Sequence, residues 1–323
     1  MSRLRLKTAF WNYDRTRALI DGRVKPDSID LDIHVLRPRV MFPRMLDNCE
    51  FDVSELSLAS YAALKSRGNC PFVAIPVMLS RFFRHSCIYV RPGSGIRDPR
   101  DLKGKRVGTT QYGSTAATYM KGMLQDEYGV RASDMHWFMG GLTAPTEPPL
   151  IPLDLPKNIK IEFLPAGRTL EQMMLADELD ALFSIYLPSI FLKGSPQIAR
   201  LFPDFKAVEQ DYYRRTGIFP IMHTIVIRED VHKAHPEAAK NIYKAFCEAK
   251  NLAIEGLYDT DALHLALPWL IDHVEEAWRV LGKDYWAYGL QPNRPTIDAL
   301  GRYVYEQGLA PRAVSASEMF LDL

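Results

Sequence analysis

The segment Leu79–Pro92 combines apolar, strand-forming residues with a basic cluster made of Arg81, Arg84 and His85; its sequence is LSRFFRHSCIYVRP. Short apolar runs bounded by proline are typical of buried strands. Cations in or beside such a strand cost free energy unless they meet an anion. We therefore expect this segment to cross between two lobes and to turn its basic residues toward a cleft that holds a small dianionic ligand. The alternative is that Arg81 and Arg84 pair with nearby carboxylates and are only structural.

A second candidate anion site is the sequence GST at residues 113–115, where a helix is expected to begin. This helix runs from about Ser114 to Tyr128. Free backbone N–H groups and small hydroxyls at a helix start can bind an anion. We expect Ser114 and Thr115 to face the cleft, and an ordinary N-cap is the alternative.

Strands and helices alternate along the chain, and this alternation must position the chemistry. Apolar runs predict strands, and apolar residues at 3.6-residue spacing predict helices. The predicted strands are Leu4–Trp11, Ile29–Leu36, Phe51–Leu58, Phe72–Leu79, Arg106–Thr110, Ile159–Leu164, Leu179–Tyr186 and a run within Gly217–Asp230. The predicted helices are Asp14–Gly22, Pro38–Cys49, Leu58–Arg67, Ser114–Tyr128, Leu170–Ala176 and Pro236–Leu257. This order indicates βαβ units and mostly parallel sheets, which is an α/β fold.

A length of 323 residues suggests two domains or one large one, and the α/β pattern favours two lobes. We expect lobe I to contain residues 1–86 and 224–323, and lobe II to contain residues 87–223. The two crossings then fall near His85 and His223, so both histidines are predicted to lie at the hinge, on the floor of the cleft. Clefts between domains are favoured ligand sites. A lone histidine in an apolar strand is otherwise a core residue.

The composition is that of an ordinary soluble protein, with 47% apolar residues, 24% charged residues and a net charge of +1. It gives no reason to expect a nucleic-acid or membrane-surface binder. The N-terminal residues lack an apolar core of signal-peptide length, and no run of 18 apolar residues occurs, so we expect a cytoplasmic protein. The four cysteines are scattered without a C-x-x-C pair, so we expect them to be reduced.

Five blocks of the chain are distinctive enough to compare with known families. They are RFFRHSCIYV, TTQYGSTAATYMKGMLQDEYGV, GIFPIMHTIVIRED, LPWL and YGLQPNRPTIDAL. Together they resemble the 4,5-dihydroxyphthalate decarboxylase family, and the resemblance runs over nearly the whole chain. It implies a two-lobed fold similar to type II periplasmic solute-binding proteins. It also implies loss of one carboxylate from 4,5-dihydroxyphthalate, which gives 3,4-dihydroxybenzoate (protocatechuate) and CO₂ in phthalate catabolism.

Such a reaction places three demands on a site. Direct loss of CO₂ would leave an unstable aryl carbanion, so the expected route protonates the ring carbon first. A hydroxyl para to the departing carboxylate supplies electron density, and no organic cofactor is expected because the phenol serves as the electron sink. The site then needs cations for the retained carboxylate, an acid beside the ring carbon, and a base or a metal at the hydroxyls.

The basic cluster and the histidines are assigned to carboxylate binding and to acid–base chemistry. Arg81 and Arg84 are expected to bind carboxylate, because a guanidinium matches it bidentately, and Arg294 is a weaker candidate. His85 and His223 are expected to be the acid and the base, in an order that the sequence leaves open.

Other residues are assigned supporting roles. Glu55 is expected to orient a histidine or take the phenolic proton, or alternatively to pair with one of the two arginines. Ser114 and Thr115 are expected to donate hydrogen bonds, and Tyr112 or Tyr288 to stack on the ring or bond its hydroxyls. The two histidines and Glu55 could also form a two-histidine, one-carboxylate metal set, although no metal is expected.

Two other function classes remain open on the sequence. One is a binding protein without catalysis that holds an aromatic acid with the same arginines and helix start. The other is a different lyase on the same fold that acts on another carboxylated ring. The expected partner is a small aromatic dicarboxylate, not a nucleic acid or a membrane, and we expect a homo-oligomer.

Overall fold

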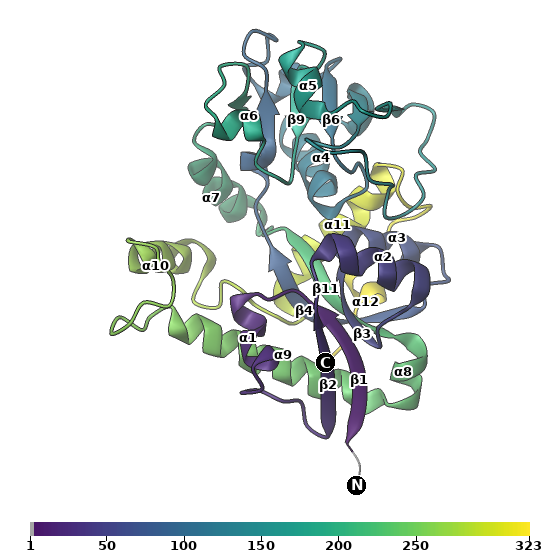
Figure 1. The fold of residues 1–323 in the computed structure, drawn as a ribbon, viewed down its shortest axis with the longest axis vertical. Helices are drawn as coiled ribbons and strands as arrows, with labels where there is room; N and C mark the ends of the chain where they lie inside the picture. The colour runs from purple at the N-terminus through teal and green to yellow at the C-terminus, as the bar shows by residue number, and fades with distance from the viewer. Residues whose placement is uncertain (1–2) are drawn as a thin grey trace.

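The computed structural model describes residues 3–323, which form two α/β lobes joined at a narrow middle (Figure 1). The first sheet has the order β2 (Ile29–Val35), β1 (Leu4–Phe10), β3 (Val53–Ser57), β11 (Ile221–Arg228) and β4 (Phe72–Arg81). The second has the order β10 (Ala199–Arg200), β5 (Ile88–Val90), β9 (Ala181–Phe183), β6 (Arg106–Thr109), β7 (His136–Met139) and β8 (Lys160–Phe163). The predicted α/β fold class is confirmed.

Both sheets are mainly parallel, and their antiparallel strands lie next to the crossings. In the first sheet β1 pairs in parallel with β2 and β3, and in the second β6 pairs in parallel with β7 and β9. Strand β11 runs antiparallel to β3 and β4, and β5 runs antiparallel to β9 and β10. These are the strands by which the chain returns to one sheet and enters the other.

Helices cover the faces of both sheets. Those that follow strands of the first sheet are α1 (Asp14–Ile20), α2 (Pro38–Asn48), α3 (Leu58–Ser66), α8 (Glu229–Ala234) and α9 (Pro236–Gly256). The second lobe carries α4 (Thr115–Tyr128), α5 (Leu170–Leu175), α6 (Ser189–Leu192) and α7 (Phe205–Thr216). The C-terminal part adds α10 (Leu270–Leu281), α11 (Arg294–Glu306) and α12 (Ala316–Met319). Helix α11 packs against both α3 and α4, so the C-terminal segment contacts both lobes.

The chain passes between the sheets twice. It leaves the first sheet at the end of β4, makes a 3₁₀ turn at His85–Cys87 and enters β5. It returns through α7 and enters the first sheet as β11. His85 therefore lies in the outgoing crossing, whereas His223 is the third residue of a strand in the first sheet.

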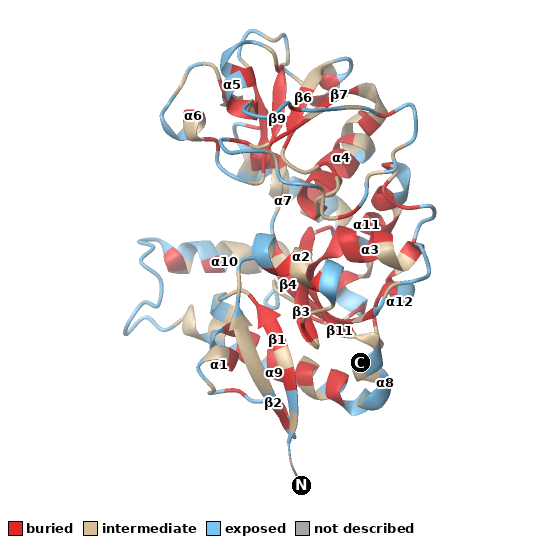
Figure 2. Cartoon of the chain, turned by 45° about the vertical axis from the view of Figure 1, so that its right-hand side comes forward, coloured by how far each residue is buried: buried red, intermediate tan, exposed pale blue. Residues whose placement is uncertain are grey.

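Buried residues are concentrated in the strands and on the helix faces against them, whereas the segment between α9 and α10 is exposed (Figure 2). One large apolar core runs through both lobes, and a smaller one lies under α5 and α6. Strand β7 was not predicted, because its four residues are too short a run to show a period. Among the helices of residues 3–323, none combines the length and apolarity that a membrane crossing requires.

Candidate active site between the lobes

A cavity of about 830 Å³ lies between the lobes, which is within the usual range of small-molecule sites. Its walls are the residues that follow parallel strands of both sheets, where ligands bind in α/β folds. The lining residues that matter below are Trp11, Tyr13, Arg37, Arg39, Phe42, Ser57, Arg84, Gln111, Ser114, Thr115, Glu147, Tyr186 and His223. The position of the cavity predicts a ligand that both lobes hold at once.

A histidine–carboxylate pair forms the chemical centre of this cavity. His223 Nδ1 lies 2.7 Å from Glu55 Oε1, and 20% of the His223 side chain is exposed, whereas Glu55 is fully buried. A carboxylate only accepts hydrogen bonds, so Nδ1 carries the proton of this contact and Nε2 remains for a ligand. The other donors to Glu55 are the Trp11 backbone N–H at 2.9 Å and the Tyr13 hydroxyl at 2.7 Å.

These three donors explain how a carboxylate survives in the middle of a buried strand, since an unpaired buried charge would be costly. Burial, followed by the charge of Glu55, raises the pKa of the Tyr13 hydroxyl well above its ordinary value. Tyr13 therefore stays a hydrogen-bond donor to Glu55. The predicted role of Glu55 in orienting a histidine has the geometry it needs.

Strand pairing brings the two side chains together. His223 lies opposite Ser57 and Ile225 lies opposite Glu55 in the antiparallel ladder of β11 and β3, so His223 and Glu55 are diagonal neighbours on one face. The pairing of β11 with β4 shifts register on both sides of His223. Such bulges re-aim a side chain and are frequent beside active sites. The bulge thus accompanies a histidine that turns toward the cavity.

Three arginines line the same cavity, and none forms an ion pair with a carboxylate in residues 3–323. Arg84 donates only to sulfur atoms, Met222 Sδ at 3.3 Å and Cys87 Sγ at 3.7 Å. Burial lowers the pKa of the Arg84 guanidinium, but an arginine stays charged at neutral pH. Arg37 stacks on Trp11 with its guanidinium carbon 5.1 Å from the ring centre. Cations without carboxylate partners create a cavity that favours an anion.

Helix starts add to this positive potential. Helices α2, α3 and α4 all begin at the cavity, with Arg37, Ser57 and Ser114 as their N-cap residues. The N-terminus of a helix carries a partial positive charge and unpaired N–H groups. Thr115 Oγ1 accepts the Ala59 N–H at 3.0 Å and lies 3.0 Å from Ser57 Oγ, so hydroxyls join the two lobes here. The predicted positions of Ser114 and Thr115 at the cleft are observed.

His85 does not line the cavity, contrary to the expectation that both histidines share its floor. Its side chain is 2% exposed and packs edge-on against Phe202 and Tyr212, with ring centres 5.2 and 5.3 Å away. Its Nδ1 lies 3.6 Å from Glu209 Oε1, beyond hydrogen-bonding distance, and has no hydrogen-bond partner in residues 3–323. Aromatic packing on α7 and the segment before it holds this ring away from the ligand space.

Arg81 is also turned away from the cavity. Its guanidinium donates to the carbonyl oxygens of Phe219 at 3.3 Å and Ala287 at 2.6 Å, and to the Asn293 side-chain oxygen. Burial lowers its pKa to about 10. Arg81 thus fastens the C-terminal segment to the crossing. Strand β4 ends at Arg81, and Arg84 caps the 3₁₀ turn that follows, so the two side chains belong to different local structures.

Three further candidates lie outside the cavity lining. Tyr112 is buried and its hydroxyl donates to the Gln307 carbonyl at 3.3 Å. Tyr288 is buried beside the C-terminal segment, and its hydroxyl has no partner within residues 3–323. Arg294 begins α11 instead of facing the cleft. Because His85 lies apart as well, the possible metal set of two histidines and Glu55 is not assembled.

Sequence reasoning missed Tyr13, Arg37, Arg39, Glu147 and Tyr186. A signal for the first three was present, because each follows a predicted parallel strand within a few residues, and such positions form ligand sites. The sequence RPR at residues 37–39 places two cations at the start of a helix. Glu147 lies in a loop between β7 and β8, and no local pattern marks it.

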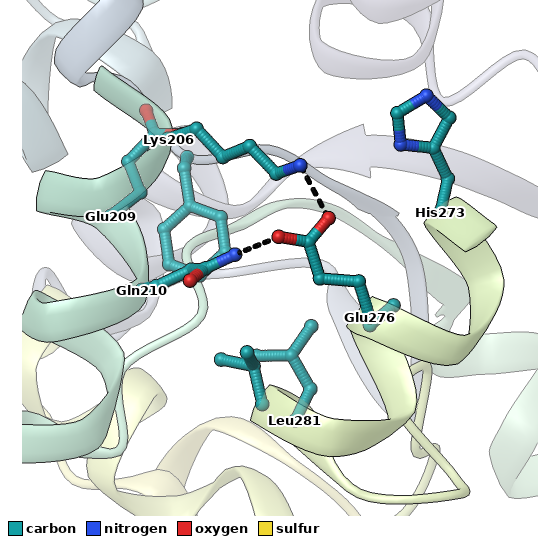
Figure 3. A pocket seen from close by; sticks show the side chains of 9 residues that line it. Lys206, Glu209, Gln210, His273, Glu276 and Leu281 are labelled. Carbon is teal, nitrogen blue, oxygen red and sulfur yellow. Dashed lines mark hydrogen bonds and ion pairs between the residues drawn. The ribbon is translucent and has the colours of Figure 1, made fainter. Parts of the chain in front are cut away.

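A second, smaller hollow of about 210 Å³ lies between α7 and α10 (Figure 3). Phe83 lines it whereas the next residue, Arg84, lines the large cavity, so the outgoing crossing separates the two spaces. Figure 3 shows Lys206 and Gln210 pointing at the Glu276 carboxylate, with the Gln210 amide donating at 2.7 Å. Because Lys206 already pairs with Glu276, it is not free to bind an anion in this hollow.

The same hollow borders the one group of three metal-type ligands found within residues 3–323, which is Asp272, His273 and Glu276. Their ligand atoms lie within 4.8 Å of one another. Glu276 already binds Lys206 and Gln210, and His273 stands apart from these contacts in Figure 3. We assign no metal role to this group.

Comparison with solved structures shows which fold the chain shares. The alkanesulfonate-binding protein SsuA from Xanthomonas axonopodis pv. citri, bound to MOPS, matches with a TM-score of 0.53 and 13% identity, over 100% of this chain and 99% of its own. The periplasmic aliphatic sulphonate binding protein SsuA from Escherichia coli matches with a TM-score of 0.54 and 12% identity, over 100% and 92%. Residues 40–142 match the family model described as ABC transporter, phosphonate, periplasmic substrate-binding protein. The predicted two-lobed, periplasmic-binding-protein-like fold is confirmed.

Sequence comparison then identifies the family. The 4,5-dihydroxyphthalate decarboxylase of Comamonas testosteroni is 38% identical over 320 residues, which cover 99% of this chain and 97% of the relative. The 4,5-dihydroxyphthalate decarboxylase of Pseudomonas putida is 37% identical over 214 residues, or 66% and 83% of the two chains. This chain therefore belongs to the 4,5-dihydroxyphthalate decarboxylase family, as its sequence blocks predicted, and the named relatives are carbon–carbon lyases.

Proposed function

We propose that this protein is a carboxy-lyase that converts 4,5-dihydroxyphthalate, or a close hydroxylated aromatic dicarboxylate, to protocatechuate and CO₂. One observation carries the proposal: His223, backed by a buried carboxylate, faces the same cavity as three arginines that have no carboxylate partner among residues 3–323. The arginines suit a dianion, and the histidine supplies an acid. The full-length relative with the same named activity supports the choice of substrate.

The retained carboxylate binds between Arg84 and the start of α4, where Ser114 and Thr115 lie, in this proposal. A guanidinium fork and a helix start both favour an oxyanion. Arg37 and Arg39 lie at the start of α2 on the opposite wall and attract the second negative charge as the substrate enters. The substrate is therefore held between lobes, with its ring beside His223.

His223 acts as the general acid. Its Nε2 proton passes to the ring carbon that bears the departing carboxylate, while electron density moves in from the para oxygen and forms a dienone. The bond to the carboxylate then breaks, CO₂ leaves, and the electron pair of that bond restores the aromatic ring. Glu55 holds Nδ1–H and stabilises the imidazolium, as a carboxylate behind a catalytic histidine does. No cofactor is proposed, because the phenol accepts the electrons.

The cellular setting is also proposed. Four unpaired cysteines support a reducing compartment, and we propose the cytoplasm. The exposed apolar run Leu263, Leu265, Leu267 and Trp269 supports a homo-oligomer, since exposed apolar patches often mark interfaces. Light scattering of the purified chain measures the oligomeric state.

Incubation of the purified chain with 4,5-dihydroxyphthalate tests the proposed function. Protocatechuate and CO₂ are expected in equal amounts, measured by chromatography and CO₂ release. The SsuA-like fold makes binding without turnover the competing result. Saturable binding of 4,5-dihydroxyphthalate with no product would contradict the decarboxylase assignment and leave a binding protein.

A further inference from the structure

We propose that Glu147 is the base that takes the proton of the ring hydroxyl, and that it selects a hydroxylated ring over an unsubstituted one. This inference rests on the proposed function, which needs a proton acceptor at the hydroxyl para to the departing carboxylate. The sequence assigned that task to a histidine or to Glu55. The structure places neither His85 nor Glu55 where a ligand in the cavity can reach it.

Elimination among the lining residues leads to Glu147. Those with an ionisable side chain, apart from the arginines, are Tyr13, Glu147, Tyr186 and His223. His223 is occupied as the acid, and the Tyr13 hydroxyl already donates to Glu55. A phenol hydroxyl such as that of Tyr186 is a hydrogen-bond donor as well as an acceptor, so it is a poorer proton acceptor than a carboxylate. Glu147 is the one carboxylate in the lining of residues 3–323, and an ionised carboxylate only accepts.

The acid and the base come from different lobes. His223 belongs to β11 of the first sheet, whereas Glu147 lies in the loop between β7 and β8 of the second lobe. The reacting carbon and the para oxygen are at opposite ends of the ring. A ring held between the lobes therefore meets an acid at one end and a base at the other.

The loop around Glu147 is tied to the helix start. Gln111 Nε2 donates to the carbonyl oxygens of Glu147 at 3.3 Å and Pro148 at 3.0 Å. The turn before it requires glycine at 141, because a Cβ there would lie 1.8 Å from the Ala144 carbonyl oxygen. The backbone of Glu147 is thus fixed beside α4, which also presents Ser114.

The step balances without another reactant. The hydroxyl O–H bond breaks and its proton joins a Glu147 carboxylate oxygen, while the electron pair stays on the ring oxygen and supports protonation at the para carbon by His223. After CO₂ leaves, Glu147 returns its proton to the ring oxygen and His223 regains one from water. The net change is one proton consumed and one CO₂ released.

Glu147→Gln tests this role, with Asp154→Asn as the matched control. Asp154 is an exposed carboxylate of the same loop that does not line the cavity. Glu147→Gln should lower kcat for 4,5-dihydroxyphthalate about 10²-fold, the low end of general-base effects. Asp154→Asn should leave kcat within two-fold. A Glu147→Gln enzyme with wild-type kcat would overturn the proposal.

A binding comparison separates this inference from the proposed function. Calorimetry with phthalate, which lacks the hydroxyls, should give the same Kd for the wild type and Glu147→Gln. Protocatechuate, which has them, should bind the variant at least five-fold more weakly. If the wild type releases no CO₂, the decarboxylase assignment fails. The Kd values of phthalate and protocatechuate still show whether Glu147 contacts the ring hydroxyls. Equal weakening of both ligands, or of neither, would contradict it.

Discussion

His85 lies in the outgoing crossing and His223 near the start of β11, where the chain re-enters the first sheet, yet their surroundings are opposite in kind. His223 opens onto the cavity with 20% of its side chain exposed and a buried carboxylate 2.7 Å from Nδ1. His85 is 2% exposed, sits between two aromatic rings and lies 3.6 Å from the nearest carboxylate. One ring is therefore oriented and accessible to a ligand, whereas the other is a packing element.

The difference shows that position in the fold is not enough to make a histidine catalytic. Both residues follow or lie in apolar strand sequences, and both are near a hinge. What separates them is the partner that the neighbouring element supplies. Strand β3 presents Glu55 to His223, whereas α7 and the residues before it present Tyr212 and Phe202 to His85.

The largest effect is expected from His223→Asn, which should lower kcat by about 10²- to 10⁴-fold, the range for loss of a general acid. The variant should keep the wild-type melting temperature, because His223 lies at the cavity surface. Turnover of 4,5-dihydroxyphthalate and thermal denaturation measure the two quantities. A kcat within ten-fold of the wild type would remove His223 from the chemistry.

Glu55→Gln should produce the next largest effect and should alter both activity and stability. The Glu55 carboxylate now accepts three hydrogen bonds. The NH₂ group of a glutamine would face one of these donors and leave it without an acceptor, which should lower the free energy of unfolding by about 1–3 kcal/mol. It would also disturb the proton on His223 Nδ1, so we expect kcat to fall about 10²-fold. This is a smaller fall than the largest one seen when the carboxylate behind a catalytic histidine is replaced. Urea unfolding and steady-state kinetics test this, and a variant with unchanged kcat would break the link between Glu55 and His223.

Arg84 and Arg81 differ in the same way as the two histidines, since Arg84 lines the cavity and Arg81 is packed away from it. Arg84→Met should raise KM about 10- to 100-fold, since a hydrogen bond to a charged group contributes about 1.5–3 kcal/mol. Arg81→Met should leave KM within a few-fold but should lower the free energy of unfolding by about 3 kcal/mol, because the Phe219 carbonyl and the Asn293 side-chain oxygen lose a donor. Kinetics and urea unfolding on both variants distinguish these outcomes. The reverse pattern would show that the two roles have been exchanged.

The smallest effect is expected from His85→Phe. Phenylalanine can fill the aromatic pocket, and of the two ring nitrogens that it removes, the buried Nδ1 has no hydrogen-bond partner within residues 3–323. A substitution that conserves volume and shape usually costs less than about 1.5 kcal/mol. We expect kcat within two-fold of the wild type and a similar melting temperature. A large fall in kcat without unfolding would place His85 in the mechanism after all.

Much of the fold could be predicted because its signals are local. Alternating strands and capped helices, such as the helix that begins after Ser114, are set by residues close in sequence. The contact between Glu55 and His223 could only be suggested, since it depends on how two strands 168 residues apart in sequence pair. The bulge that turns His223 toward the cavity leaves no mark in its own sequence.

The incorrect placements have a common physical cause. Arg81 and His85 were grouped with Arg84 because they are close in sequence, but the strand ends at Arg81 and a 3₁₀ turn begins at His85, so the three side chains face different surroundings. What each side contains is decided by distant segments, namely the α7 region for His85 and the C-terminal segment for Arg81. Glu147 was missed for the same reason, because its role depends on a loop folding back over α4.

A crystal structure of the chain with phthalate bound tests the central claim most directly. The account predicts one carboxylate at Arg84 and the ring carbon of the other about 3–3.5 Å from His223 Nε2, the separation of reacting atoms in a productive complex. A ligand bound beside His85, or in the hollow between α7 and α10, would contradict it.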